Sequence, residues 1–305
     1  MSYLNLIRWK NLLLLIIAQV LVKYALLEPF NVTTRLSNFE FLVLVFATLC
    51  IAAAGNIIND IYDVQTDSIN KPKQLIIGKH ISENQAYNLF FTLTIIGVSL
   101  GFYLSYRIGN LSFFGIFAMI SMALYVYASY LKGTIIFGNI LISLLVAMSI
   151  IIVGVFDVLP VISYANRDTQ LTFFDIILDY AFFAFLINLI RELIKDIQDV
   201  DGDYKAGMNT LPIAIGRERA NKIAFIVSMI PIGVIIYFLV TYLYKQPIAI
   251  GYFLILIIAP LLYATIKIFG ASNTFDYKHI STIYKVVMLL GVLSLLLYPL
   301  LIKTV

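Results

Sequence analysis

Charge is scarce in this sequence. Only 12% of its 305 residues are Asp, Glu, Lys or Arg, whereas soluble domains usually contain about 25%. Hydrophobic residues make up 61%, more than a water-soluble fold of this length could bury. The composition therefore excludes an ordinary soluble domain and indicates that lipid solvates much of the surface. With a net charge of +4 and no basic run, the sequence also lacks the signature of a nucleic-acid-binding protein.

Residues that form disulfides and zinc sites are also few. The one cysteine, Cys50, has no partner for an intrachain disulfide and lies in an apolar stretch, so we expect a buried helix residue. The two histidines, His80 and His279, are far apart and lack the spacing of zinc ligands. The sequence therefore predicts neither a disulfide nor a zinc site.

Long apolar runs are what the sequence does contain. Nine of them approach or reach the roughly 20 residues that a helix needs to cross a bilayer. They lack the alternation of membrane β-barrel strands and are too long for such strands. The sequence thus predicts an all-α, polytopic membrane protein: a single domain over residues 1–305, with nine transmembrane helices around a central cavity. The predicted spans are 11–27, 39–59, 86–106, 111–131, 134–157, 173–191, 221–244, 247–268 and 283–302.

Basic residues are distributed unevenly between the two sides that nine spans define. The N-terminal side holds most of the 21, and the opposite side holds six. Because cytoplasmic loops of membrane proteins carry an excess of Lys and Arg, we expect a multi-pass protein of the cell membrane with a cytoplasmic N-terminus. The six residues on the opposite side are Lys23, Arg35, Arg107, Arg167, Lys245 and Lys303.

Acidic residues gather in two polar segments, 56–72 and 191–207, which follow the second and the sixth span. Each segment is predicted to continue its helix, so that steps of three and four residues return to nearly the same face. Asp60 and Asp201 fall off these faces, and we expect solvated or capping roles for them. The first stripe is Asn59, Asp63 and Asp67, and the second is Asp196, Asp199 and Asp203.

Rows of like charge destabilise a helix unless cations relieve the repulsion. Mg²⁺ suits this role because it binds one or two carboxylates and fills its other positions with water and substrate phosphate. Two facing stripes predict Mg²⁺ ions around a diphosphate, which they would stabilise as a leaving group. An allylic diphosphate would then give a carbocation, for which the 22 Phe and 20 Tyr can form protective walls. One acidic segment alone is usually a solvated turn, but two at matching positions favour a metal site.

The two stripes resemble the Asp-rich motifs of the UbiA-type intramembrane prenyltransferases. Asn59-x₃-Asp63-x₃-Asp67 is similar to the first motif, and Asp199-x₃-Asp203 is similar to the second. The number of spans and the place of the motifs also match that family, so the resemblance covers nearly the whole chain. It implies that all six stripe residues serve catalysis, with Asp63, Asp67, Asp199 and Asp203 as the Mg²⁺ ligands.

Several cations and one tyrosine extend the resemblance. Lys71-Pro72 is similar to a basic-Pro element after the first motif, although residues 73–78 depart from the usual Pro-Ser-Gly. For Lys132, snorkelling of the side chain to the membrane interface is an equally good explanation as a role in substrate binding. For Arg8, the topology alone would explain a basic residue before the first span. The resemblance implies that the substrates are bound by Arg8, Lys71, Tyr127, Lys132, Arg191 and Lys195.

The segment 191–203, followed by Thr210-Leu211-Pro212, is most similar to the digeranylgeranylglyceryl phosphate synthase branch of this family. That resemblance implies an enzyme of class EC 2.5.1 that transfers a prenyl group, expected to be geranylgeranyl, from a prenyl diphosphate to geranylgeranylglyceryl phosphate. An aromatic quinone precursor is the alternative acceptor. A secondary transporter is the alternative from another class, but transporters place polar groups at mid-membrane, whereas these acids cluster at one interface.

Overall fold

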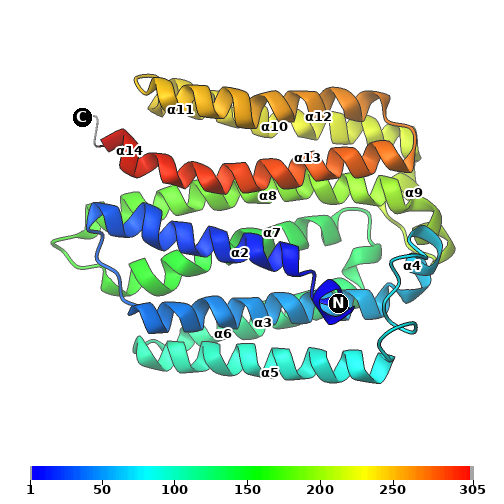
Figure 1. Cartoon of the computed structure of the whole chain (residues 1–305), viewed down its shortest axis with the longest axis horizontal. Helices are drawn as coiled ribbons and strands as arrows, with labels where there is room; N and C mark the ends of the chain where they lie inside the picture. The colour runs from blue at the N-terminus through cyan, green and yellow to red at the C-terminus, as the bar shows by residue number, and fades with distance from the viewer. Residues whose placement is uncertain (1, 303–305) are drawn as a thin grey trace.

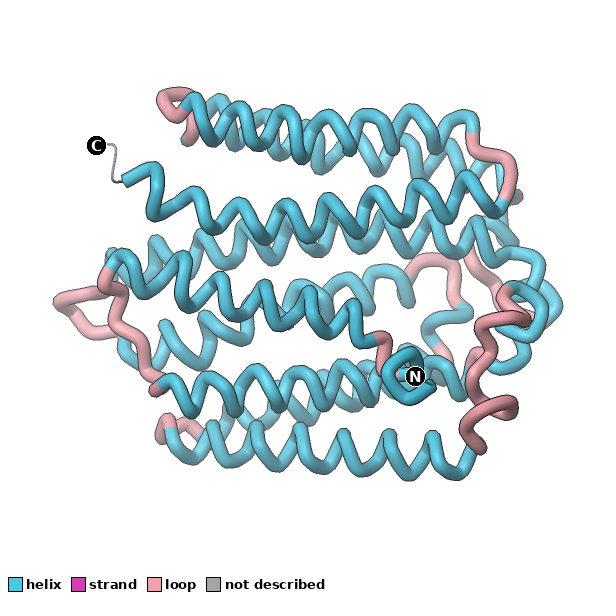
Figure 2. Tube along the Cα trace, viewed as in Figure 1, coloured by secondary structure: helices cyan, strands magenta, loops and turns pink. Residues whose placement is uncertain are grey.

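A computed structural model describes residues 2–302, and it is helical almost throughout (Figures 1 and 2). Within these residues nine helical stretches are long and apolar enough to cross a membrane, which confirms the predicted all-α polytopic fold. The stretches run side by side along the long axis of the molecule. No strand occurs in this part of the chain, only an isolated bridge between Ile77 and Ile81. The single domain over 1–305 stays a prediction.

Short elements join, extend or interrupt the spanning helices. The first four spans are α2 (Trp9–Leu21) with η1 (Val22–Leu27) and η2 (Glu28–Phe30), α3 (Asn38–Tyr62), α5 (Glu83–Arg107), and η3 (Leu111–Phe113) with α6 (Phe114–Ser129). The next three are α7 (Phe137–Val153) with η5 (Gly154–Val158) and η6 (Leu159–Val161), α8 (Arg167–Lys205), and α10 (Arg217–Tyr242). The last two are α11 (Pro247–Tyr252) with η7 (Phe253–Ile258) and α12 (Ala259–Gly270), and α13 (Thr274–Leu293) with η8 (Ser294–Leu297) and α14 (Tyr298–Ile302). Outside the spans lie α1 (Ser2–Leu6), α4 (Val64–Asn70), η4 (Leu131–Gly133) and α9 (Leu211–Ile215).

The sequence marks where two of these helices begin. Ser37 accepts a hydrogen bond from the backbone of Glu40, whose side chain bonds back to Ser37, and this capping box starts α3. Ser82 and Gln85 form the same reciprocal pair at the start of α5. The caps satisfy backbone N–H groups that a helix leaves without partners in its first turn.

Both acidic segments lie at one end of the bundle. In Figure 1 the short helices α1, α4 and α9 gather at that end, together with the start of the chain, whereas α14 lies at the opposite end. The two ends of the described chain therefore lie on opposite sides, as an odd number of crossings requires. Lys303, which was counted on the opposite side, lies outside the described residues.

One pair of charges is buried inside the bundle, which the sequence analysis did not foresee. Lys23, which lies in the predicted span 11–27 and was counted on the side opposite the N-terminus, donates a 2.9 Å hydrogen bond to Asp157, and both side chains are at most 1% exposed. Lys23 also donates to the Leu36 carbonyl, while Asp157 accepts from the Leu36 N–H. Both charges lie in π-helical turns, η1 and η5. The Lys23 charge can be buried because it is paired and hydrogen-bonded.

Candidate active site

A cavity of about 950 Å³ opens among the helices at the acidic end of the bundle. Around its mouth it is polar, and deeper it is lined by apolar side chains such as Leu124, Leu145 and Ile152. Every residue that the sequence analysis proposed for catalysis, metal binding or substrate binding lines this one cavity. The structure thus brings both stripes and the selected cations together, while the roles of these residues stay predictions.

The first stripe follows a helix that bends at its middle member. α3 ends at Tyr62 and α4 begins at Val64, with Asp63 between them at φ −86° and ψ 0°. The prediction of one uninterrupted helix was therefore wrong at this residue. The four-residue step survives, since the Asp63 N–H donates to the Asn59 carbonyl at 2.9 Å and the Asp67 N–H donates to the Asp63 carbonyl at 2.8 Å. The stripe consequently stays on one side of the bend.

Asp63 is buried and only partly satisfied. Its Oδ2 accepts a 2.6 Å hydrogen bond from Asn59 Nδ2 and forms an ion pair with Lys132. Its Oδ1 is buried without a hydrogen-bond partner. A buried carboxylate oxygen without a partner raises the free energy of the folded protein. Asp63 Oδ1 can therefore bind a further cation or hydrogen-bond donor. The pairing also directs Lys132 into the cavity, which the snorkelling interpretation does not explain.

The second stripe lies on one continuous helix, as predicted. α8 is 39 residues long and carries the stripe beyond the apolar span that was expected to end at 191. Asp196 accepts a 2.8 Å hydrogen bond from Asn139 on α7, and Asp199 Oδ2 accepts a 2.5 Å bond from Lys71 Nζ. Asp203 is 6% exposed. Each of these carboxylates is therefore hydrogen-bonded by the protein or buried, and is not solvated by water alone.

Two lysines connect the carboxylates of the stripes. Lys71 lies 2.5 Å from Asp199 and 4.0 Å from Asp67, so it joins the two stripes. Burial alone would lower the pKa of Lys132, but the charge and hydrogen bond of Asp63 raise it above its ordinary value. Burial and the charge of Asp63 raise the pKa of Asp67, an effect that Lys71 and Lys132 oppose. The site thus concentrates negative charge that needs cations to stabilise it.

An asparagine that the sequence analysis did not select fastens the two stripes together. Asn70, the last residue of α4, donates to the Asp199 carbonyl at 2.8 Å and accepts from the Gly202 N–H at 2.9 Å. A Cβ at position 202 would overlap the Asn70 side chain. Glycine at 202 therefore permits the close approach of α4 to α8. The only available signal was the position of Asn70 beside Lys71.

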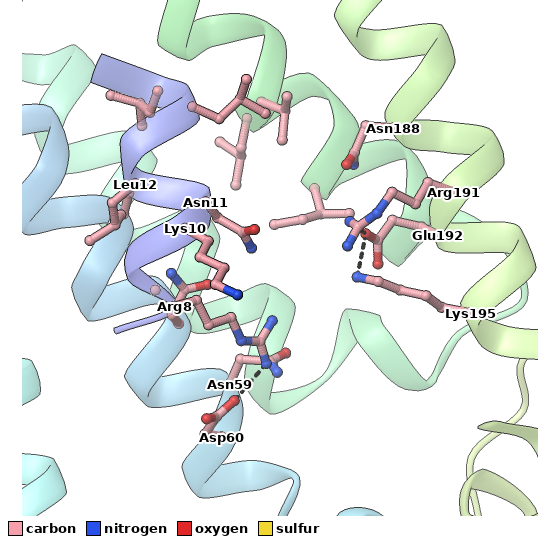
Figure 3. A pocket seen from close by; sticks show the side chains of 18 of the residues that line it. Arg8, Lys10, Asn11, Leu12, Asn59, Asp60, Asn188, Arg191, Glu192 and Lys195 are labelled. Atoms are coloured by element: carbon pink, nitrogen blue, oxygen red, sulfur yellow. Dashed lines mark hydrogen bonds and ion pairs between the residues drawn. The ribbon is translucent and has the colours of Figure 1, made fainter. Parts of the chain in front are cut away.

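Arg8 and Asp60 form a second link at the mouth of the cavity (Figure 3). They are joined at 2.6 Å, and their side chains are 37% and 17% exposed. Arg8 has a left-handed backbone, with φ 53°, at the junction of α1 and α2, a conformation that is uncommon outside glycine. Asp60 was expected to be solvated or to cap a helix, and this was wrong, because it lines the cavity and pairs with Arg8. Asp201 is solvated as expected, with its side chain 81% exposed.

A further set of polar residues extends along α8 toward the membrane interior. Figure 3 shows Arg191, Glu192 and Lys195 on one wall of the cavity, opposite Arg8 and the start of α2. Lys195 Nζ and Arg191 Nη1 both donate to the same Glu192 oxygen, at 2.7 and 3.3 Å. This group therefore lies apart from the acid–lysine pairs of the stripes.

The donors near the two stripes are those that a hard divalent cation prefers. The side chains of the stripes themselves offer five carboxylates and one amide, whose oxygens are the ligands that Mg²⁺ prefers. Within residues 2–302 no three acidic, cysteine or histidine side chains are gathered closely enough to enclose an ion.

Comparison with known proteins decides the family. Residues 30–286 match the UbiA prenyltransferase family. The chain belongs to that family. Among its relatives, the digeranylgeranylglyceryl phosphate synthase of Korarchaeum cryptofilum is 31% identical over 81% of each chain. The enzyme of the same name from Methanosphaera stadtmanae is 28% identical over 89% of this chain and 88% of its own.

Solved structures of UbiA-type proteins share the fold. One, described as a digeranylgeranylglyceryl phosphate synthase, has a TM-score of 0.62 at 24% identity and covers 97% of this chain and 98% of its own. A UbiA homologue from Archaeoglobus fulgidus bound to GPP and Mg²⁺ has a TM-score of 0.59 at 18% identity, with coverage of 97% and 99%. The UbiA family resemblance and the multi-pass membrane fold predicted from the sequence are thereby confirmed.

Proposed function

We propose that this UbiA-family protein transfers a geranylgeranyl group from geranylgeranyl diphosphate to geranylgeranylglyceryl phosphate, with Mg²⁺ as cofactor. The main support for the proposal is that two acidic stripes and two lysines lie together at the mouth of an apolar cavity. The names of the relatives from Korarchaeum cryptofilum and Methanosphaera stadtmanae support the glycerol phosphate acceptor.

The stripes fit a site for Mg²⁺ and diphosphate. Asp63, Asp67, Asp199 and Asp203 would hold the metal, and the free Oδ1 of Asp63 offers an oxygen that has no other partner. Bound Mg²⁺ would neutralise the diphosphate and stabilise it as a leaving group. The Archaeoglobus fulgidus homologue bound to GPP and Mg²⁺ supports the choice of metal.

The chain's own residues would orient the diphosphate and protect the reacting carbon. Lys71 and Lys132, now paired with Asp199 and Asp63, are within reach of the same space and would donate to phosphate oxygens. In the reaction the bond between the allylic carbon and the diphosphate oxygen breaks, a new bond to the acceptor hydroxyl oxygen forms, and the hydroxyl proton is released. Tyr127, which lines the cavity and is 9% exposed, would exclude water and favour the developing positive charge.

The depth of the cavity supports a long prenyl donor. The cavity is lined from Asp63 down one face of α3 to Thr48, a length of about 22 Å at the helical rise. An extended geranylgeranyl chain is about 20 Å long at ordinary carbon–carbon bond lengths. A donor of this length would therefore keep its diphosphate at the stripes and its tail along the apolar wall.

We also propose that the N-terminus and the acidic end face the cytoplasm of a cell membrane, because the excess of basic residues lies on that side. The test uses Cys50→Ala as background, since Cys50 is the one cysteine. Lys73→Cys and Tyr164→Cys then place exposed thiols at opposite ends. An impermeant maleimide applied to intact cells should label position 164 and spare position 73, and the reverse pattern would refute the orientation.

The activity itself is tested with purified protein and labelled geranylgeranyl diphosphate. The acceptors are geranylgeranylglyceryl phosphate and a panel of phenolic quinone precursors. We expect rapid transfer to the glycerol phosphate, dependent on Mg²⁺ and abolished by excess chelator. Faster transfer to a phenol would replace this acceptor with the aromatic alternative, and full activity in chelator would refute the metal.

A further inference from the structure

The cavity contains a second group of cations, away from the acidic stripes. Arg191 and Lys195 belong to α8, Lys285 belongs to α13, and Lys10 and Asn11 belong to the start of α2; all of them line the cavity. Figure 3 shows the α2 residues across the cavity from Arg191 and Lys195. Three helices that are distant in sequence thus direct positive side chains to one region, which we call the cationic cluster (Lys10, Arg191, Lys195 and Lys285).

The cationic cluster is only partly neutralised by the protein. Arg191 and Lys195 share one oxygen of Glu192. Lys285 Nζ donates at 2.6 Å to Asn11 Oδ1, a neutral acceptor, and the positive charges of Arg191 and Lys10 lie near enough to act on it. The Nε of Arg191 is buried without a hydrogen-bond partner. Because like charges repel strongly where water is scarce, this arrangement calls for an anion.

The diphosphate is not the anion that this cluster is placed to bind. The cations that form ion pairs with stripe carboxylates are Lys71, which pairs with Asp199, and Lys132, which pairs with Asp63. The cationic cluster instead lies farther along α8 toward the membrane interior, where Glu192 is the carboxylate that joins it. Lys71 and Lys132 therefore form one set of cations and the cationic cluster forms another, while Arg8 pairs with Asp60.

We propose that Lys285, together with Arg191 and Lys195, binds the phosphate monoester of the acceptor and so selects a phosphorylated acceptor over an uncharged one. The inference rests on the proposed prenyl transfer and assigns Lys285 a role in substrate specificity. A phosphate monoester carries between one and two negative charges at neutral pH and accepts several charge-assisted hydrogen bonds. Held there, the acceptor presents its hydroxyl toward the stripes, where the prenyl carbon reacts. A phenol would leave the cluster without a counterion.

The test compares Lys285→Met with wild type in two-substrate kinetics. The Michaelis constant for geranylgeranylglyceryl phosphate should rise about ten- to hundredfold, the loss that follows from removing a hydrogen bond to a charged group. The constant for geranylgeranyl diphosphate should stay within about twofold, which also shows that the variant is folded. Lys195→Met should give the same signature, and Lys285→Arg should retain most of the affinity. Lys278→Met is the matched control, because Lys278 lies on the same helix but is exposed.

A second substrate makes the result specific to the phosphate. Wild type should prefer the phosphorylated acceptor to its dephosphorylated analogue, geranylgeranylglycerol, and Lys285→Met should lose most of that preference. An unchanged preference in an active Lys285→Met protein would overturn this inference and leave the proposed function intact, as would an equal rise in both Michaelis constants. Failure of the wild-type protein to use any glycerol phosphate would overturn the proposed acceptor together with the inference.

Discussion

At the scale of single residues, the site depends on carboxylates that are paired with lysines but not fully satisfied. Asp63 keeps one buried oxygen free while its other oxygen bonds Asn59 and Lys132. Removing its charge would leave Lys132 without this counterion and would remove a proposed metal ligand. We therefore expect the residue to be more important for chemistry than for folding.

We expect Asp63→Asn and Asp199→Asn each to lower turnover on the order of 10³-fold or more, because a metal's contribution to the leaving group amounts to several kcal/mol. Transfer of labelled geranylgeranyl diphosphate measures the loss. Asp201→Asn is the control, since Asp201 is solvated and should keep nearly full activity. Comparable losses at all three positions would contradict the assignment of the stripes.

The stripes could be predicted from sequence because a helical step of three or four residues fixes which side chains share a face. The bend at Asp63 could not be predicted, since the i to i+4 hydrogen bonds continue on both sides of it. Neither could the role of Lys285, which lies inside α13 far along the chain and carries no motif. The role proposed for Lys285 depends on its proximity to Asn11 and Arg191, and only the packing of α13 against α2 and α8 brings these residues together.

At the scale of elements, α4 is held against α8 by one asparagine. Asn70 makes two hydrogen bonds to the α8 backbone, and Gly202 leaves room for it. These bonds set the separation of the two stripes, because Asp67 lies one turn before Asn70 and Asp199 lies one turn before Gly202. A small displacement here would change how both stripes face a shared ligand.

We expect Gly202→Ala to reduce kcat/KM for the prenyl diphosphate about tenfold, the cost of losing two hydrogen bonds. Asn70→Ala should cause a similar loss, and the double variant should be no worse than Asn70→Ala alone, because the overlap disappears. Gly233→Ala is the control, since a Cβ there meets nothing within 4 Å. Additive losses in the double variant would show that the two residues act independently.

At the scale of the whole molecule, the bundle is pinned at the end opposite the active site. Lys23 and Asp157 join the first and the fifth span, and both bond the backbone of Leu36 between the first two spans. The nine apolar spans could be predicted from length and composition, and the structure has nine within residues 2–302. The pair itself could not, because its partners are 134 residues apart and each was an isolated charge in the sequence.

We expect Lys23→Met to destabilise the folded protein by about 3–5 kcal/mol, because it leaves Asp157 buried without a counterion. The melting temperature in a fixed detergent measures the effect. The double variant Lys23→Met, Asp157→Leu should recover much of the stability, since no unpaired charge remains. The turnover of the folded fraction should stay close to wild type, because neither residue lines the cavity. An unchanged melting temperature in Lys23→Met would show that the pair does not stabilise the bundle.

The proposed active site requires that the two stripes together bind a divalent metal with a prenyl diphosphate, and this joint binding can be measured directly. Mn²⁺ in place of Mg²⁺ can be followed by electron paramagnetic resonance, with a thiodiphosphate analogue of geranylgeranyl diphosphate that does not react. We predict that wild type binds Mn²⁺ tightly only when the analogue is present, and that Asp63→Asn and Asp199→Asn each abolish this joint binding. Equal binding by wild type and both variants would show that the two stripes do not bind the metal and the diphosphate together.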